Sequence, residues 1–173
     1  MAQNIELKAR CGSMESAIRT AEELGAKRIG ELAQSDTYYR TRTGRLKIRK
    51  EGDRRELIAY SRPDRTAARK SEYTLLPLAD GDSMHEALAS TLGVMGEVRK
   101  TRLLYLHENV RIHLDTVHEL GTFLEFEAIV DDRCDEKKAA EKIEKLVEIF
   151  HIKRKDLVAV SYSDLLGFTV HTA

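Results

Sequence analysis

Ionisable residues occupy every second position in several strand-like segments of this chain. Residues 45–49 read Arg-Leu-Lys-Ile-Arg and residues 123–127 read Phe-Leu-Glu-Phe-Glu, and segments 4–10 and 111–115 show the same alternation. Because successive side chains of a β-strand point to opposite faces, each segment would have one apolar and one charged face. A solvated face would more usually carry Thr, Ser, Gln and scattered single charges. The pattern therefore predicts a curled or closed sheet with a charged interior.

Charge is unevenly distributed along the chain, although the formal net charge is zero. Residues 40–70 contain twelve basic and four acidic side chains, whereas residues 115–148 contain eleven acidic and five basic ones. No aromatic interleaving or recognised binding motif accompanies the basic segment, so we do not expect nucleic acid as a partner. Together, the basic and acidic segments better fit a site for phosphate groups and metal ions.

Composition and length fit one soluble globular domain spanning residues 1–173. The chain is 42% apolar and 34% charged, which leaves enough apolar material for a sizeable core. Its two thiols, Cys11 and Cys134, have no CxxC or Cys/His spacing and predict neither a disulfide framework nor a zinc site. A charged strand begins within the first residues, and no apolar run approaches membrane-spanning length. We therefore expect a cytoplasmic protein with no membrane partner.

Three helices and several antiparallel strands are expected. The helices are 13–24, which ends before Gly25, 83–92, which opens with a capping box of Ser83 and Glu86, and 135–150. Strands are expected at 3–10, 36–50, 55–62, 70–77, 97–107, 109–117, 121–130 and 157–163, with a turn at Thr43-Gly44 inside the second range. The apolar stripes of the helices would pack outside the sheet on its outward residues, namely Leu46, Ile48, Ile112, Leu114, Leu124 and Phe126.

Four carboxylates share the expected inward face: Glu6, Asp115, Glu125 and Glu127. Hard oxygen ligands suit Mg²⁺ or Mn²⁺, whose coordination is usually completed by water and substrate phosphate oxygens. Phosphoryl and nucleotidyl transfer depend largely on positioning and charge neutralisation, so such a site needs no protein nucleophile. The alternative is a charged face that is merely solvated.

Matching cations could bind the phosphate oxygens, because Arg offers bidentate contacts and Lys a point charge. These substrate-binding candidates are Lys8, Arg45, Lys47, Arg49, Arg62, Lys100, Arg102 and Arg111. His113 shares their face and could act as a base or proton relay, although a lone His is more often structural. The six tyrosines could stack on a nucleobase, but they are also expected simply as sheet residues.

Several motifs together resemble the CYTH superfamily, the triphosphate tunnel metalloenzymes that include class IV adenylate cyclases and thiamine and inorganic triphosphatases. The resemblance follows nearly the whole chain in order, and the closing motif is similar to that of the bacterial and archaeal cyclase-like branch. The residues that carry it are 4–8 (Asn-Ile-Glu-Leu-Lys), 44–49, 60–63, 98–102, 112–115, 120–127 and 161–168.

This resemblance implies an α+β fold: an eight-stranded antiparallel β-barrel, or triphosphate tunnel, with helices packed outside. It implies metal-binding positions at Glu6, Asp115, Glu125 and Glu127, and phosphate-binding positions at Lys8, Lys47, Arg49, Arg62, Lys100 and Arg102. Glu6, Lys8 and Asp115 are the expected catalytic residues. Asn4 stands where the family signature has its first Glu, so one metal contact keeps an oxygen but loses a charge.

The expected activity is that of a class IV adenylate cyclase, which converts ATP to cAMP and pyrophosphate with Mg²⁺ or Mn²⁺. In this reaction the ribose 3′-hydroxyl attacks the α-phosphorus. One alternative is a triphosphatase that hydrolyses inorganic, nucleoside or thiamine triphosphate. Another is a binding module that recognises polyphosphate or nucleotide without turning it over. A homodimer would be in keeping with the cyclase branch.

Overall fold

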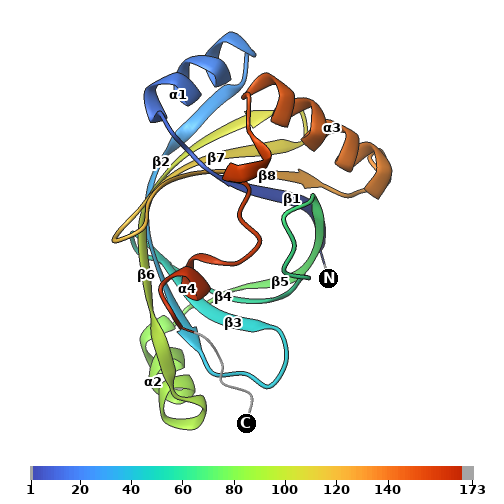
Figure 1. Ribbon diagram of the computed structural model, residues 1–173. Helices are drawn as coiled ribbons and strands as arrows, with labels where there is room; N and C mark the ends of the chain where they lie inside the picture. Colours follow the sequence, from blue (N-terminus) through green and yellow to red (C-terminus); the bar gives the residue numbers. More distant parts are fainter. Residues whose placement is uncertain (1, 169–173) are drawn as a thin grey trace.

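The computed structural model describes residues 2–168, and within them the chain forms a closed antiparallel β-barrel of eight strands (Figure 1). Around the barrel the order is β1-β5-β4-β3-β2-β6-β7-β8, and the β1–β8 pairing closes it. The predicted fold class is therefore confirmed. The strands are β1 (Ala2–Arg10), β2 (Lys27–Tyr39), β3 (Arg45–Glu51), β4 (Arg54–Ser61), β5 (Arg69–Pro77), β6 (Val94–His107), β7 (Val110–Val117) and β8 (Gly121–Ile129).

Three longer helices follow the predicted ranges closely: α1 (Met14–Glu23), α2 (Gly81–Leu92) and α3 (Glu136–Ile149). Ser13 and Asp135 cap α1 and α3 by accepting backbone N–H bonds, which satisfies donors that a helix start leaves free. The predicted capping box of α2 is wrong. Asp80 is the N-cap and accepts from the Ser83 backbone N–H, so the helix begins earlier than Ser83.

One strand prediction is incomplete. The range 36–50 contains the end of β2 and the start of β3, and the chain turns between them at the predicted Thr43-Gly44 turn, with Gly44 in the left-handed conformation (φ 66°). The first part of β2, from Lys27, was not predicted because its side chains are mostly exposed and do not alternate; pairing with β6 holds it in the sheet.

The range 157–163 forms no strand, so that prediction is wrong. Its residues make the single bridge Ala9–Leu157 and then enter the short helix α4 (Tyr162–Leu165), which follows the 3-10 helix η1 (Arg154–Asp156). Ser161 and Asp164 form a capping box that starts α4, and this local hydrogen bonding competes successfully with strand pairing.

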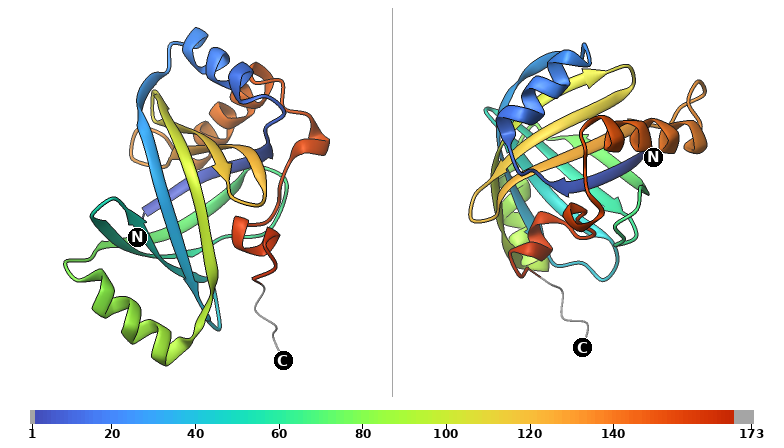
Figure 2. Two further views of the ribbon diagram at one scale, coloured as in Figure 1. Left: turned by 90° about the vertical axis from the view of Figure 1, so that its left-hand side faces the viewer. Right: turned by 45° about the horizontal axis from the view of Figure 1, so that its top comes forward.

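The main apolar core lies between the outside of the barrel and helices α1 and α3 (Figure 1, Figure 2). Four predicted outward residues are buried there: Ile112, Leu114, Leu124 and Phe126. Helix α1 contributes Ala17 and Ala21, and α3 contributes Ala139, Ile143 and Leu146. Because these apolar faces point outward, the alternate residues of β7 and β8 must point into the barrel.

A second apolar cluster lies at one end of the barrel interior. Tyr38, Val98, Val117 and Phe123 pack there against the segment that follows α3, which we call the C-terminal segment (residues 157–168). Figure 1 shows α4 in this segment lying in front of the barrel opening. Phe168 packs so closely on Gly96 that no Cβ would fit there. The C-terminal segment therefore covers one mouth of the barrel.

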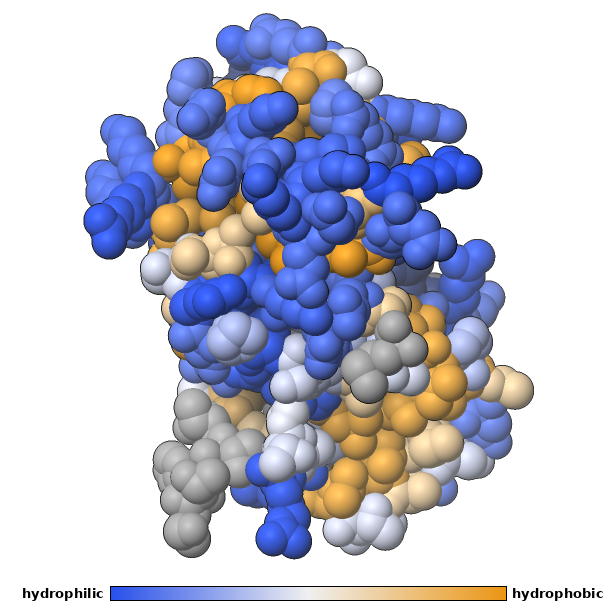
Figure 3. Space-filling model, turned by 90° about the vertical axis from the view of Figure 1, so that its right-hand side faces the viewer, coloured by the Kyte–Doolittle hydropathy of each residue, from blue (hydrophilic) through white to orange (hydrophobic). Residues whose placement is uncertain are grey.

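The outer surface is hydrophilic in one part of the molecule and apolar in another. Figure 3 shows a mostly hydrophilic upper part and an apolar area on the lower part of one face. Leu75 and Leu76, at the end of β5, are 42% and 51% exposed. Across residues 2–168, no helix has the length and apolar character that a membrane crossing requires.

Candidate active site

The interior of the barrel contains a polar cavity of about 140 Å³ beneath the C-terminal segment. Ten of the predicted site residues line it: Glu6, Lys8, Lys47, Arg49, Arg62, Lys100, Arg102, Arg111, Glu125 and Glu127. They come from strands on several sides of the barrel and from the residue that follows β4. Residues that are distant in sequence thus share one cavity because alternate positions of closed strands point inward.

One group of cations meets on a buried carboxylate that the sequence analysis missed. Asp36 Oδ2 accepts from Lys47 Nζ at 2.7 Å, Lys100 Nζ at 2.9 Å and Arg49 Nη2 at 2.8 Å, while Arg49 Nε donates to Oδ1 at 2.7 Å. We call these four residues the Asp36 cluster. Burial alone would raise the pKa of Asp36, but the three cations hold it well below its usual range.

The two lysines of the Asp36 cluster have unusually low pKa values. Burial, reinforced by Arg49, lowers the pKa of Lys47 to about 7, although Asp36 opposes this effect. Burial lowers the pKa of Lys100 to about 8, again against the attraction of Asp36. An incoming anion would favour the charged form of both side chains.

A second group of charges surrounds Arg102. Its guanidinium donates to Asp115 at 2.7 and 2.6 Å and to Glu125 at 2.9 Å. Lys8 also pairs with Glu125, at 3.3 Å. Burial would raise the pKa of Asp115 and of Glu125, but Arg102 holds the first below its usual value, and Lys8 with His113 and Arg102 holds the second well below. Both carboxylates are therefore ionised although they are buried, Asp115 completely and Glu125 with 7% of its surface exposed.

Two predicted residues lie outside the cavity lining. Asp115 has no exposed surface and lies behind Arg102, where it also accepts a hydrogen bond from the Tyr162 hydroxyl. Arg45 instead borders a separate surface pocket and pairs with Asp64 and Asp164, each at 2.9 Å. In this arrangement Asp115 orients Arg102, and Arg45 ties α4 to β3.

Glu6 lies between two arginines. Arg62 and Arg69 approach its Oε1 at 3.2 and 3.1 Å. Burial nevertheless raises the pKa of Glu6, and the neighbouring carboxylate of Glu125 adds to the rise. A further positive charge beside Glu6 would relieve this electrostatic cost, which is what a bound metal ion would provide.

Candidate metal ligands converge on the same side of the cavity. Ligand atoms of His113, Glu125 and Glu127 lie within 4.8 Å of one another. His113 Nδ1 is 3.4 Å from Glu125 Oε2 and 3.9 Å from Glu127 Oε1. Metal bonds of about 2.0–2.2 Å place ligand atoms at such separations.

Asn4 offers one more oxygen. Its Oδ1 is buried and has no hydrogen-bond partner among residues 2–168, and the residue lines the cavity. A buried oxygen without a partner is costly, so a cation there would satisfy it. The residues present therefore fit a divalent metal ion near His113, Glu125 and Glu127, with Asn4 and Glu6 lining the same cavity.

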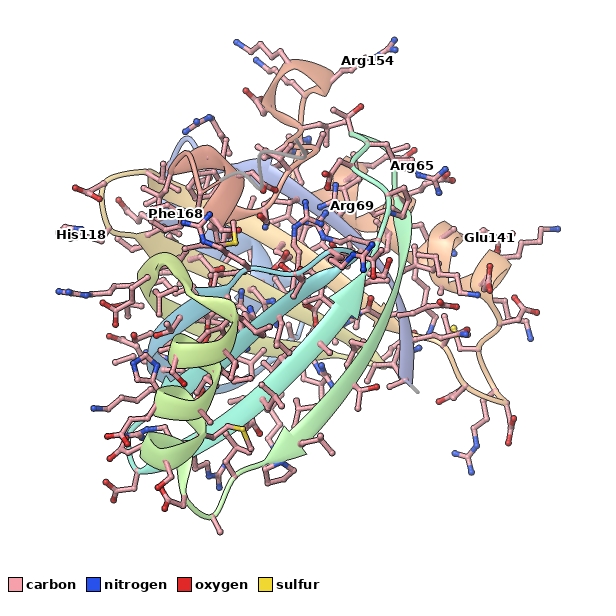
Figure 4. The ribbon with its side chains drawn as sticks, turned by 90° about the horizontal axis from the view of Figure 1, so that it is seen from below. Arg65, Arg69, His118, Glu141, Arg154 and Phe168 are labelled. Atoms are coloured by element: carbon pink, nitrogen blue, oxygen red, sulfur yellow. The ribbon has the colours of Figure 1, made fainter. Side chains whose placement is uncertain are left out.

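Sequence reasoning missed several residues of the site. Asp36 and Arg69 lie in segments where charged and apolar residues do not alternate strictly, so charge alternation did not indicate their direction. Figure 4 shows Arg69 among the inner side chains, whereas Arg154 and Glu141 lie at the periphery. Tyr162 was placed in a strand that does not form. The aspartate of the Asp36-Thr37-Tyr38-Tyr39 run, two residues before an inward tyrosine, was the available signal for Asp36.

The cavity is chemically suited to a polyanion with a metal ion. Cations from β1, β3 and β6 could bind phosphate oxygens on one side, and carboxylates from β1 and β8 could hold a divalent ion on the other. A compact site of this kind stabilises negative charge that develops on phosphate.

The chain is similar to known proteins over almost its whole length. The family model described as "CYTH domain" matches residues 2–162. A protein of Methanocaldococcus jannaschii named "Putative adenylate cyclase MJ0240" is 25% identical over 94% of this chain and 98% of its own length.

Solved structures share the fold. The PH1012 protein of Pyrococcus horikoshii superposes with a TM-score of 0.84 at 24% identity, covering 94% of this chain and 98% of its own. A Hippeastrum protein described as "Putative adenylyl cyclase HpAC1", with a dominant triphosphatase activity, has a TM-score of 0.62 at 16% identity, covering 97% and 95%.

Proposed function

We propose that this chain, which belongs to the CYTH domain family, is an enzyme that binds a triphosphate together with Mg²⁺ or Mn²⁺ inside its barrel. The observation that carries the proposal is the composition of one cavity, which is lined by seven cations and four carboxylates. The cations are Lys8, Lys47, Arg49, Arg62, Lys100, Arg102 and Arg111, and the carboxylates are Glu6, Asp36, Glu125 and Glu127. Such a balance suits an extended anion that is accompanied by a divalent cation.

The reaction that we favour is cyclisation of ATP to cAMP and pyrophosphate. The name of the M. jannaschii relative supports this choice, since that protein aligns with nearly the whole chain. Lys47, Arg49 and Lys100 would bind the phosphates and neutralise the charge of the pyrophosphate leaving group. The metal ion, when bound, would lower the cost of deprotonating the ribose 3′-hydroxyl and stabilise charge on the α-phosphate.

The other assigned residues would organise this site. Lys8 and Arg102 would hold Glu125 in place for the metal, and Asp115 would orient Arg102 rather than contact the ion itself. Arg62 and Arg111 would stand at the edges of the phosphate site, paired with Glu6 and Glu127. In this assignment Arg45 has a structural role.

Hydrolysis of a triphosphate is the second candidate. The same cations and carboxylates would serve it, with water attacking the terminal phosphorus in place of the ribose hydroxyl. The described triphosphatase activity of the Hippeastrum protein supports keeping this reaction open for a barrel of this type.

A third candidate is a protein that binds polyphosphate or nucleotide without turnover. Asn4 supports it, because an amide oxygen supplies less charge to a metal ion than a carboxylate would. The homodimer and the cytoplasmic location stay predictions from the sequence.

One assay separates the three candidates. Purified protein is incubated with ATP and Mn²⁺, and the products are resolved by anion exchange. A cyclase yields cAMP and pyrophosphate, a triphosphatase yields ADP and phosphate, and a binding protein leaves ATP intact while still binding it in calorimetry. Failure to bind ATP or tripolyphosphate with Mn²⁺ or Mg²⁺ would remove the proposal altogether.

A further inference from the structure

The Asp36 cluster presents a physical contradiction if the cavity binds phosphates. A carboxylate that is only 1% exposed lies among the three cations that would bind the ligand. By charge alone, Asp36 should repel a triphosphate and weaken its binding. The geometry of the hydrogen bonds indicates the opposite role.

Asp36 uses only part of the hydrogen-bonding capacity of its partners. Each lysine ammonium has three N–H groups, of which one is directed at Asp36 Oδ2. Arg49 directs its Nε and one Nη2 N–H to the carboxylate, and its guanidinium has five N–H donors. All four residues line the cavity, so the remaining N–H groups are available to a ligand on the cavity side.

The cluster would be unstable without its anion. Lys47 and Arg49 come from β3 and Lys100 from β6, while Asp36 lies on β2 between them. Three buried cations with no counter-ion repel one another, and flexible lysine side chains would turn away or lose their protons. Asp36 is therefore the group that keeps cations from two different strands together before any ligand arrives.

We propose that Asp36 is a positioning residue, a permanent internal anion that holds Lys47, Arg49 and Lys100 in the arrangement that binds phosphate oxygens. The inference rests on the proposed function, since it takes the ligand to be a polyanion. It goes further by assigning to Asp36 a role that improves anion binding although the residue is itself an anion. The carboxylate keeps its contacts with the cations when the ligand is bound.

The inference is tested by whether one substitution weakens or strengthens the binding of tripolyphosphate. Asp36→Asn removes a negative charge from the anion site and replaces two acceptor oxygens by one. We expect at least tenfold weaker binding of tripolyphosphate by calorimetry. The matched control is Glu51→Gln, which removes a negative charge two residues after Arg49 on β3, where Glu51 accepts a hydrogen bond from Gln34 at 2.6 Å. Binding by the control should be unchanged or slightly tighter, as Coulomb repulsion predicts.

The pH profile provides a readout that a purely structural role would not move. Asp36 and Arg49 act on both Lys47 and Lys100, Arg102 and Asp115 act on Lys100, and Lys47 Nζ lies over the rings of Tyr38 and Tyr60. Asp36 raises the pKa of both lysines, and Asp115 adds to this effect only at Lys100. Its loss should shift the high-pH limit of tripolyphosphate binding to lower pH, whereas Glu51→Gln should leave that limit in place.

The results of these experiments distinguish a failure of the inference from a failure of the proposed function. A folded Asp36→Asn protein that binds tripolyphosphate as tightly as wild type, or more tightly, overturns the inference but leaves the proposed function standing. Wild-type protein that fails to bind tripolyphosphate overturns both. If Asp36→Asn does not fold, the structure of the wild-type complex with tripolyphosphate decides: Asp36 should still contact Lys47 and Lys100, and a carboxylate turned away from them overturns the inference.

Discussion

The Tyr162 hydroxyl donates a hydrogen bond of 2.9 Å to Asp115 Oδ2, and so joins the C-terminal segment to the charged interior of the barrel. The ring of Tyr162 also lies 3.8 Å beneath Lys8 Nζ and packs edge-on against Phe123, at 4.9 Å between ring centroids. Burial and the carboxylates of Asp115 and Glu125 raise the pKa of the Tyr162 phenol well above its usual value. Tyr162 therefore stays protonated and acts as a donor.

Replacing Tyr162 with Phe should destabilise the protein by about 1–3 kcal/mol, because Asp115 is fully buried and loses one donor to its charge. The aromatic contacts with Lys8 and Phe123 remain in this variant, so the lost stability is due to the hydroxyl alone. Urea unfolding measures the difference. Tyr73→Phe is the control, since Tyr73 is only half-buried, and its effect should stay within about 0.5 kcal/mol. Equal effects of the two substitutions would contradict the assigned role of Tyr162.

We expect Arg102 to stabilise the ligand-free protein as well as to take part in ligand binding. Arg102→Met keeps much of the side-chain volume but leaves Asp115 and Glu125 without their shared cation, so we expect a loss of about 3–5 kcal/mol in unfolding free energy. Arg111→Met is the matched control. Its side chain is 40% exposed and pairs with Glu127 at 3.4 Å, so the loss should not exceed about 1 kcal/mol. A well-folded Arg102→Met protein with unchanged stability would argue against this account.

The parts of the fold that could be predicted are those with a strict period. Strands β3, β7 and β8 alternate charged and apolar residues, and helix α3 repeats apolar residues at helical spacing, so both their type and their buried face follow from sequence. The beginning of β2 has no such period. It is a strand because it pairs with β6, and the local sequence does not predict such a long-range contact.

The cavity residues also divide into those that lie in strictly alternating segments and those that do not. Glu125 and Lys47 were found because their strands alternate strictly, which fixes the direction of every second side chain. Asp36 was missed because charged and apolar residues do not alternate strictly around it, and its partners come from β3 and β6. Metal binding by Asp115 stays a prediction from the sequence. The hydrogen bonds from Arg102 and Tyr162 to its carboxylate depend on packing that no local pattern reveals.

Glu127 is the carboxylate best suited to test metal binding. It lines the cavity, and its pairing with Arg111 is long and partly exposed, whereas Glu125 is also needed by Lys8 and Arg102. Wild-type protein should gain about 2.7 kcal/mol of stability when Mn²⁺ is present at a hundred times its dissociation constant. Glu127→Gln should lose most of this gain in a thermal melt yet remain folded without metal.

Glu119→Gln is the control for this experiment, because it removes the same charge from an exposed turn outside the cavity. Its Mn²⁺-dependent gain should equal that of wild type. A gain that is the same in all three proteins would mean that Glu127 does not bind the ion.

The low pKa of Lys47 predicts that binding a polyanion takes up protons. At pH 8 a side chain with a pKa of about 7 is mostly uncharged in the free protein, and a bound triphosphate would favour its charged form. The uptake should therefore appear above pH 7 and vanish below it, where Lys47 is already charged. Lys47→Met should reduce the uptake at pH 8 by up to about one proton per molecule of tripolyphosphate.

Calorimetry in two buffers of different ionisation enthalpy measures this uptake, and the protonation of tripolyphosphate itself cancels between the two proteins. Lys50→Met, on the exposed outer face of the same strand, is the control and should take up as many protons as wild type. If Lys47→Met takes up as many protons as the control, the protons enter elsewhere and Lys47 does not meet the phosphates. A reduced uptake would instead identify Lys47 as a cation that the ligand charges on arrival, which places the ligand near Lys47 within the barrel.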